Sequence, residues 1–492
     1  MQTTQKTRTT QDTLDFSQEE LKTLLDKSTE LILKQFEKAY QQPGYHDFPQ
    51  KEVASWFDEP IPTEGMPLDA LFDLVETKIL DTATGNLAPN MYAYVMTGGN
   101  QVSIVADALA STINQNVTKW HLAPAITEIE KRVIQWAAEL IGFQQSAHQS
   151  VGGFLSSSGS SANLDGLTVA RNIYFEQADI RNQGLFGMKP FTVYCSNETH
   201  NSVDKSIQLL GIGTNQLRHI PTLDDFTIDL VALEQQINQD LQDGFQPFCV
   251  IGNAGTVNTG AIDDLNAIAQ IAKKYQLWFH VDGAYGGLAS SLDTKKSLYQ
   301  GIELADSVAL DFHKWFYQPF EVGCVLVKSW DHLHRTYFKK ASYLDKSLDK
   351  DTGRLELNEH HFLLSRNAKA LKVWMSTKAY GANRIKSMIQ KDIDLTNYLN
   401  EQIKQSDDFK LVASSELAIS CFQYTRGTTD QNQVVQLNKA LIPALEQDGR
   451  VFITGTTLKG QFVLRACFIN HRKDERSTRY LLEVIREVGQ NL

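Results

Sequence analysis

A lysine and an aspartate, each close to the end of a short apolar strand, could together do covalent chemistry. Lys314 follows SVALDFH and precedes two aromatic residues, so we expect its amine to be partly desolvated. Desolvation favours the neutral amine, which can form a Schiff base with an aldehyde. Asp282 closes the run LWFHVD, where a buried carboxylate needs a cationic or hydrogen-bonding partner, such as a protonated pyridine nitrogen. Ala284 is small enough to lie beneath a flat ring.

A serine–glycine turn could provide the third part of such a site, a position for an anion. The turn Ser158-Gly159-Ser160-Ser161 leads into the helical pattern ANLDGLTVARNIYFE. Free N–H groups at a helix N-terminus attract phosphate. Each of the three features also has an ordinary alternative, namely an exposed loop lysine, a turn aspartate or a plain helix cap. The three features count as a site only when they are taken together.

The elements that must position these residues alternate along the chain. Residues 127–143 and 263–276 have helical periodicity, and five segments are short apolar strands: FTVYCS, FCVIGNAG, LWFHVDG, SVALDF and GCVLVK. Strands that are apolar on both faces and separated by helices predict a parallel or mixed α/β sheet with helices on both sides. Ligands of such sheets bind at the carboxyl ends of the strands, which is where Asp282 and Lys314 fall.

The two ends of the chain predict additional parts. A helix is expected from Phe16 to about Gln42, opening with a capping box of Ser17 and Glu20. The Pro/Gly-rich stretches QQPGYHDFPQ and DEPIPTEGMP then connect it to the main body. Beyond about residue 380, helix, strand, helix and strand predict a smaller α/β domain. We therefore predict an N-terminal helical segment (1–90), a large domain (91–378) and a small C-terminal domain (379–492).

Composition narrows the classes of function. The 492 residues carry a net charge of −11 without a run of Lys or Arg, which argues against nucleic acid or an acidic membrane surface as a partner. Neither a secretion signal nor an apolar span of bilayer length is present, so we expect a soluble, cytoplasmic protein with a small-molecule substrate. The five scattered cysteines form no zinc pattern, so we expect reduced thiols and no metal site.

Five motifs in chain order resemble those of one enzyme family: S-G-S-S-A-N, E-T-H-N-S, N-A-G-T-V-N-T-G, H-V-D-G-A-Y-G-G and D-F-H-K-W. Between about Asn90 and Gly381 the chain resembles the group II decarboxylases that depend on pyridoxal 5'-phosphate (PLP). The aromatic-L-amino-acid, glutamate and 2,4-diaminobutyrate decarboxylases belong to this family. The resemblance implies the PLP-dependent transferase fold (fold type I) and a homodimer with active sites at the subunit interface.

The resemblance also implies roles for individual residues. Lys314 would carry PLP as a Schiff base, Asp282 would hold the pyridine nitrogen, and His200 would stack on the ring. Tyr343, in the family's mobile loop KKASYLDKS, would protonate the carbanionic carbon after carbon dioxide leaves. Outside this set of motifs, His200 would pass for a strand-end histidine and Tyr343 for an exposed loop aromatic. The implied remaining contacts are Gly159, Ser160 and His313 to the phosphate, Thr256 and Ala284 along the ring, and Thr97, Trp120 and Pro124 to the substrate.

We therefore predict that the protein decarboxylates an L-amino acid to its amine, with an aromatic substrate favoured. The runner-up is 2,4-diaminobutyrate or an acidic substrate (glutamate or aspartate), because LDFHK also resembles the diaminobutyrate branch and Lys119 could meet a side-chain carboxylate. Another PLP reaction, such as that of an aldehyde synthase or aminotransferase, and a catalytically silent binding protein are further alternatives. Phe312 and Gly283 depart from the frequent proline and alanine of the family, but neither departure removes a reacting group. A dehydrogenase or a serine hydrolase is disfavoured, because GIGTNQ lacks the third glycine and no G-x-S-x-G elbow is present.

Overall fold

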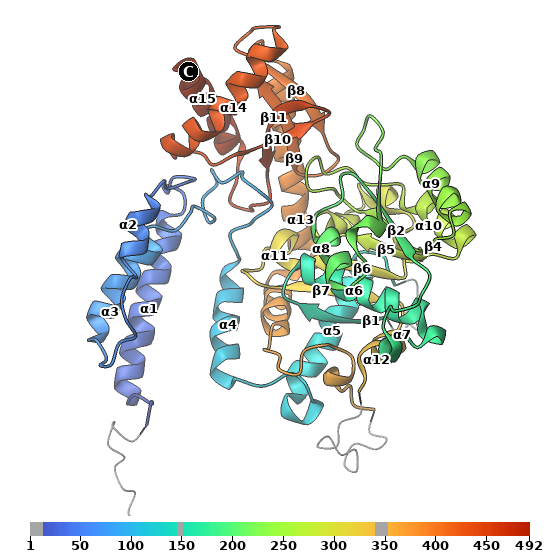
Figure 1. The fold of residues 1–492 in the computed structure, drawn as a ribbon. Helices are drawn as coiled ribbons and strands as arrows, with labels where there is room; N and C mark the ends of the chain where they lie inside the picture. The colour runs from blue at the N-terminus through green and yellow to red at the C-terminus, as the bar shows by residue number, and fades with distance from the viewer. Residues whose placement is uncertain (1–12, 145–150, 340–352) are drawn as a thin grey trace, which may run out of the picture.

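A seven-stranded sheet forms the centre of the large domain in the computed structural model, which describes residues 13–144, 151–339 and 353–492 (Figure 1). The strand order is β1-β7-β6-β5-β4-β2-β3, and β7 runs opposite to the other six strands, which are parallel to one another. The predicted mixed, mainly parallel sheet is therefore confirmed. The strands are β1 (Gly152–Ser156), β2 (Phe191–Ser196), β3 (Leu217–Ile220), β4 (Gln246–Asn253), β5 (Trp278–Asp282), β6 (Ser307–Asp311) and β7 (Gly323–Val327).

Helices cover both faces of this sheet, because successive strand residues point to opposite sides. In β6, Leu310 packs into the core that includes α5, α9 and α10, whereas Ala309 packs into the core that includes α6, α8 and α12. Both faces are thus buried, as the uninterrupted apolar strands predict. The helices are α5 (Pro124–Leu140), α9 (Leu230–Gln242) and α10 (Leu265–Tyr275) on one face, and α6 (Gly159–Tyr174), α8 (Ser202–Leu209) and α12 (Trp330–Tyr337) on the other.

A second, smaller sheet forms the C-terminal domain, as predicted. Its four strands are antiparallel in the order β10-β11-β9-β8. Helix α13 (Ala370–Lys404) leads into it and is interrupted at Gly381, whose φ of 74° lies in the left-handed region. This break lies close to the predicted domain boundary at residue 378, which stays a prediction. The other elements are β8 (Phe409–Ser414), β9 (Ile419–Tyr424), β10 (Thr454–Leu458), β11 (Gln461–Cys467), α14 (Gln431–Asp448) and α15 (Glu475–Gln490).

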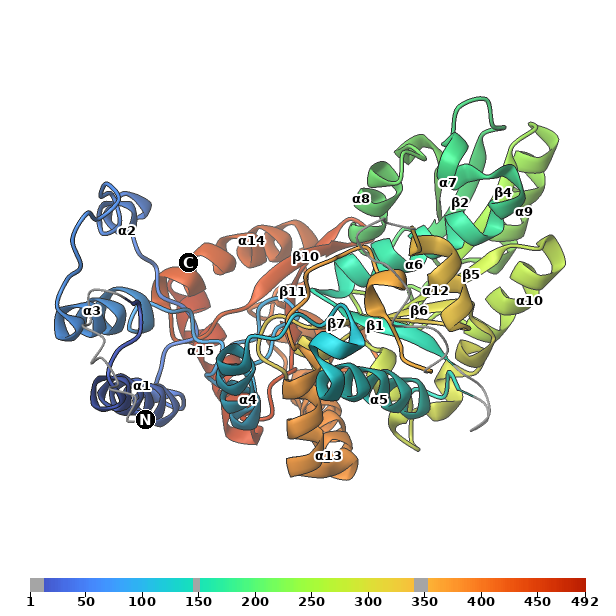
Figure 2. The ribbon, with the colours of Figure 1, turned by 90° about the horizontal axis from the view of Figure 1, so that it is seen from below.

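The N-terminal helices form an arm that projects from the body of the molecule (Figures 1 and 2). Helix α1 (Gln18–Lys38) begins with the predicted capping box of Ser17 and Glu20. Helix α2 (Gln50–Ser55) lies between the two predicted connector stretches, and α3 (Leu68–Val75) follows the second. None of the three helices has a buried residue. Among the helices of the described residues, none is long and apolar enough to cross a membrane.

Candidate active site

Eight of the residues singled out in the sequence line a single cavity of about 180 Å³ at one edge of the large sheet. The carboxyl ends of β5 and β6 supply some of them, because parallel strands end at the same edge. The first turn of α6 and the loops after β2 and β4 supply the others. These residues are Gly159, Ser160, His200, Thr256, Asp282, Ala284, His313 and Lys314.

The carboxylate of Asp282 is buried and held from two sides. Its side chain is 7% exposed, its Oδ2 accepts a hydrogen bond from Asn163 Nδ2 at 2.9 Å, and its Oδ1 accepts one from the Ala284 N–H at 3.1 Å. Lys314 lies in the short helix α11 (Phe312–Trp315) and is half-buried. Within the described residues, its Nζ makes no hydrogen bond or ion pair, so the amine is available for a covalent bond.

The segment that carries Lys314 is anchored by a carboxylate in α13. Trp315 Nε1 and Tyr317 OH donate to Asp392 Oδ2 at 3.0 and 2.8 Å. Asp392 is fully buried, and burial raises its pKa to about 7. The Trp315 ring also stacks on Tyr285, with ring centroids 5.1 Å apart. These contacts fix the backbone on the C-terminal side of Lys314.

Replacing Asp392 with asparagine should change how stability depends on pH. The folded-state pKa lies above the unfolded value, so the folded carboxyl keeps its proton from about pH 4 to about pH 7, whereas the unfolded chain releases it. Wild-type stability therefore falls across that window, and an asparagine does not titrate. Relative to wild type, Asp392→Asn should gain roughly 2 to 3 kcal/mol between about pH 5 and about pH 8. Denaturant unfolding at both pH values measures this gain, and a difference that stays constant with pH would contradict it.

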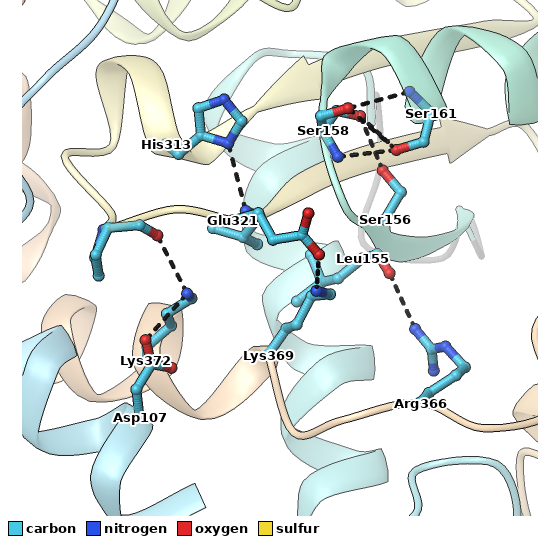
Figure 3. A network of polar contacts seen from close by, with 12 residues as sticks. Asp107, Leu155, Ser156, Ser158, Ser161, His313, Glu321, Arg366, Lys369 and Lys372 are labelled. Atoms are coloured by element: carbon cyan, nitrogen blue, oxygen red, sulfur yellow. Dashed lines mark hydrogen bonds and ion pairs between the residues drawn. The ribbon is translucent and has the colours of Figure 1, made fainter. Parts of the chain in front are cut away.

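Ion pairs also hold the loop that follows α11. Lys369 Nζ lies 2.7 Å from Glu321 Oε1, and Lys372 Nζ donates to the Pro319 carbonyl at 3.1 Å (Figure 3). Lys372 Nζ also lies 3.2 Å from Asp107 Oδ2 in helix α4 (Gln101–Ile113). The two lysines thus tie the loop to α13 and α4.

The N-terminus of α6 also lines the cavity. It offers N–H donors, whereas Asp282 offers a carboxylate. Ser158 and Ser161 form a capping box (Figure 3), and Ser158 lines the cavity together with His313. The Gly159 N–H donates to Asp311 Oδ2 at 2.9 Å, and Asp311 Oδ1 lies 2.8 Å from His313 Nδ1. A Cβ at residue 159 would lie 2.6 Å from the Ala284 Cβ, so glycine permits this close approach. An anion here would meet Ser160 and His313, because Asp311 already engages the Gly159 N–H.

His200 borders the cavity on the side of α8. Its Nδ1 accepts a hydrogen bond from the Ser202 N–H at 3.2 Å, so the neutral ring carries its proton on Nε2. The pKa of His200 is lowered, chiefly because the ring is partly withdrawn from water. The ring is therefore neutral at neutral pH and can lie flat against an apolar surface.

The cavity fits PLP in three respects. Lys314 offers an unpaired amine for the aldehyde, Asp282 offers a buried carboxylate for the pyridine nitrogen, and Ser160 offers a helix N-terminus for the phosphate. The chemistry of these groups therefore matches the cofactor.

Three predicted substrate contacts lie outside this cavity. The Thr97 hydroxyl is buried and has no hydrogen-bond partner within the described residues. Trp120 Nε1 donates to Glu128 at 3.0 Å, and the Arg354 guanidinium lies 4.5 Å from the Trp120 ring. Pro124 is the first residue of α5. The predicted proton donor Tyr343 lies outside the described residues. The roles of all four stay predictions.

Three cavity residues lie in the quoted motifs, but the sequence analysis gave them no role of their own. Asp311 ends β6 just as Asp282 ends β5, so the rule that found one carboxylate could have found both. Asn163 follows Ser160 by about one helical turn and could have been found from the same face of α6. Ser202 lies at the start of α8 and closes the motif E-T-H-N-S, but its residue type does not indicate which side chains it contacts.

Comparisons with known proteins agree with this geometry. The pyridoxal-dependent decarboxylase conserved domain matches residues 49–425. An aromatic-L-amino-acid decarboxylase of Bacillus atrophaeus is 32% identical over 476 residues, covering 96% of each chain. Tyrosine decarboxylase 3 of Petroselinum crispum is 28% identical over 417 residues, covering 83% of this chain and 80% of its own. The crystal structure of Oryza sativa TDC with PLP and tryptamine superimposes with a TM-score of 0.91 at 23% identity, covering 97% of this chain and 99% of that one.

The chain belongs to the pyridoxal-dependent decarboxylase family. Its cofactor is PLP, and its class of reaction is the decarboxylation of an amino acid.

Proposed function

We propose that the protein converts an aromatic L-amino acid into the corresponding amine and carbon dioxide. The unpaired Lys314 amine and the buried Asp282 carboxylate in one cavity carry this proposal. Relatives named for aromatic amino acids, tyrosine and tryptophan support an aromatic substrate. Carbon dioxide release from a panel of L-amino acids tests it. Tyrosine, tryptophan or phenylalanine should give the highest kcat/KM, and a preference for an acidic or diamino substrate would overturn the aromatic assignment.

Each residue has a distinct part in this proposal. When bound, PLP supplies a conjugated ring that accepts the electrons released as the α-carboxylate leaves. Lys314 Nζ holds the cofactor covalently between turnovers, and Asp282 holds positive charge at the ring nitrogen. His200 covers a ring face as a neutral imidazole. Tyr343 delivers the proton to the α carbon, and its loop excludes water.

A diaminobutyrate or acidic substrate is the second candidate. A solved structure from Vibrio parahaemolyticus, named as the glutamate decarboxylase domain of a diaminobutyrate–pyruvate transaminase and L-2,4-diaminobutyrate decarboxylase, supports it. That chain is 26% identical with a TM-score of 0.84, covering 96% of each chain. The same substrate panel separates the two candidates.

Replacing Tyr343 with phenylalanine tests decarboxylation against aldehyde synthesis. A phenylacetaldehyde synthase of Arabidopsis thaliana is 27% identical, so both outcomes occur among the relatives. Without the phenol proton, amine formation should fall about 10²- to 10⁴-fold. Carbon dioxide release should continue in part, with oxygen consumed and aldehyde, ammonia and hydrogen peroxide formed. Tyr398→Phe, whose hydroxyl contacts Arg479 far from the cavity, should leave the product unchanged. Unaltered amine formation by Tyr343→Phe would contradict the assigned role.

We also propose that the protein is a homodimer held by its N-terminal arm. On α1, Leu21, Leu25 and Ile32 are 50%, 58% and 40% exposed and recur on one face of the helix. Because α1 to α3 have no buried residue of their own, this apolar face needs a partner surface, and a second copy of the chain supplies one.

Charges on that face should separate the subunits. The double variant Leu25→Glu and Ile32→Glu should shift the protein from dimer to monomer, measured by sedimentation velocity. Thr23→Glu adds the same kind of charge on the opposite, polar face of α1 and should leave the dimer intact. A dimeric double variant, or a monomeric wild type, would refute the role of the arm.

A further inference from the structure

A chain of buried polar side chains lies directly behind Asp282. Asn163 Nδ2 donates to Asp282 Oδ2 at 2.9 Å, and Asn163 Oδ1 lies 2.9 Å from His280 Nε2. His280 Nδ1 lies 2.8 Å from Ser307 Oγ, which accepts from Trp278 Nε1 at 2.9 Å. None of these side chains is more than 7% exposed, so bulk water does not compete for their hydrogen bonds.

Only one arrangement of protons satisfies this chain. An ionised Asp282 can only accept, so the amide nitrogen of Asn163 must face it and the amide oxygen must face His280. His280 then has to donate from Nε2. Burial lowers the pKa of His280 to about 4, so the ring is neutral and its Nδ1 accepts from the Ser307 hydroxyl. Trp278, which can only donate, completes the sequence.

The second N–H of Asn163 leads to His200. Asn163 Nδ2 donates to Ser202 Oγ at 3.2 Å, and that hydroxyl lies 2.8 Å from His200 Nδ1. The Ser202 hydroxyl therefore accepts from Asn163 and donates to His200, which leaves the His200 proton on Nε2. The Asn163 amide thus connects Asp282 with His200, two of the residues that are proposed to contact the cofactor ring.

The packing of α6 depends on a small residue at this point. Gly166 lies about one helical turn after Asn163, and a Cβ there would lie 2.7 Å from His280 Cε1. The missing side chain lets the His280 ring pass under α6 and reach the Asn163 amide. Gly166 leaves space on α6 for the His280 ring, and Asn163 accepts its hydrogen bond.

We propose that Asn163 is a positioning residue that aligns the Asp282 carboxylate and, through the Ser202 hydroxyl, supports the His200 tautomer that the Ser202 N–H also selects, with neutral His280 fixing the direction of its amide. Asn163 lines the cavity, but its amide is engaged by Asp282, Ser202 and His280, so it acts through its neighbours. This inference rests on the proposed contact between Asp282 and the cofactor ring. The affinity for PLP, which does not require turnover, reports on it.

A double-mutant cycle tests the proposal. The PLP dissociation constant is measured by equilibrium dialysis on the full-length chain for wild type, Asn163→Ala, Asp282→Asn and the double variant. Asn163→Ala should weaken PLP binding about 10-fold in wild type, because a hydrogen bond to a charged group is lost. In the Asp282→Asn background the same change should have less than about a 3-fold effect. An equal loss in both backgrounds would overturn the proposal, since a purely structural role does not depend on the Asp282 charge.

Asn172→Ala provides the matched control. Asn172 is a buried asparagine on the same helix, and its Oδ1 accepts from Arg171 Nε at 3.1 Å away from the cavity. It should lower the melting temperature but leave PLP affinity unchanged. If Asp282→Asn alone leaves PLP affinity unchanged, the proposed ring contact fails, and this result is distinct from a failure of the Asn163 coupling.

A pair of His280 variants gives a second, independent test. His280→Gln keeps an N–H donor for the Asn163 oxygen, whereas His280→Leu removes it and leaves that oxygen buried without a donor. His280→Leu should weaken PLP binding about 10-fold, and His280→Gln should restore most of this loss. Equal affinities for the two variants would contradict the assigned direction of the amide.

Discussion

Replacing Lys314 with alanine should abolish the visible absorbance of the bound cofactor and lower turnover by at least about 10⁴-fold. The amine of Lys314 is the group in the cavity that can bond covalently to the cofactor aldehyde, and alanine cannot replace it. PLP added to the variant should be removed by gel filtration. Absorbance spectra and carbon dioxide release, measured on the same sample, check both effects.

Lys328→Ala is the control for this variant. Lys328 follows β7 at the edge of the sheet that lies opposite the cavity. It forms an ion pair with Asp306 at 2.7 Å. It should keep the cofactor absorbance and lose at most a few-fold in activity. A Lys314→Ala protein that retained both absorbance and turnover would refute the assignment of Lys314.

Replacing Asp282 with asparagine should have the second largest effect, a loss in kcat of about 10²- to 10⁴-fold. The amide has nearly the same shape but no charge, so it cannot hold positive charge at the ring nitrogen. The Asn163 amide nitrogen would also face a side chain that no longer has to accept. Steady-state kinetics at saturating PLP separate this effect from weaker cofactor binding.

Asp240→Asn is the matched control for a buried carboxylate. Asp240 is 2% exposed and pairs with Arg218 at 3.0 Å, outside the cavity. Its loss should lower the melting temperature but leave kcat within a few-fold of wild type. Similar kinetic losses in both variants would mean that Asp282 supports the fold and does not act on the cofactor.

Much of the fold could be predicted because the central strands are continuous apolar runs. All five predicted strands occur, and α1 begins at its predicted capping box. The sequence did not reveal β1, since GGFLS contains only two large apolar residues, or the four-residue β3, LRHI, which is only half-buried. Helix α4 also went unrecognised, because its face toward α13 is formed by small residues such as Ser103 and Ala106.

The parts of the site that lie at the ends of elements could be predicted in the same way. Asp282, Lys314 and Ser160 each follow a strand or open a helix, so the order of elements brings them to one edge of the sheet. Asn163 and Ser202 matter only through contacts across α6, β5 and α8, which no local pattern encodes. Thr97, Trp120 and Pro124 lie outside the cavity, and their roles stay predictions.

Mapping the covalent attachment point of the cofactor tests the central claim most directly. Borohydride reduction of the full-length protein with bound PLP, followed by proteolysis and mass spectrometry, should place the phosphopyridoxyl group on the peptide that contains Lys314. No other lysine should carry it in stoichiometric amounts. A label on a different lysine, or a protein that binds PLP without becoming labelled, would contradict the account.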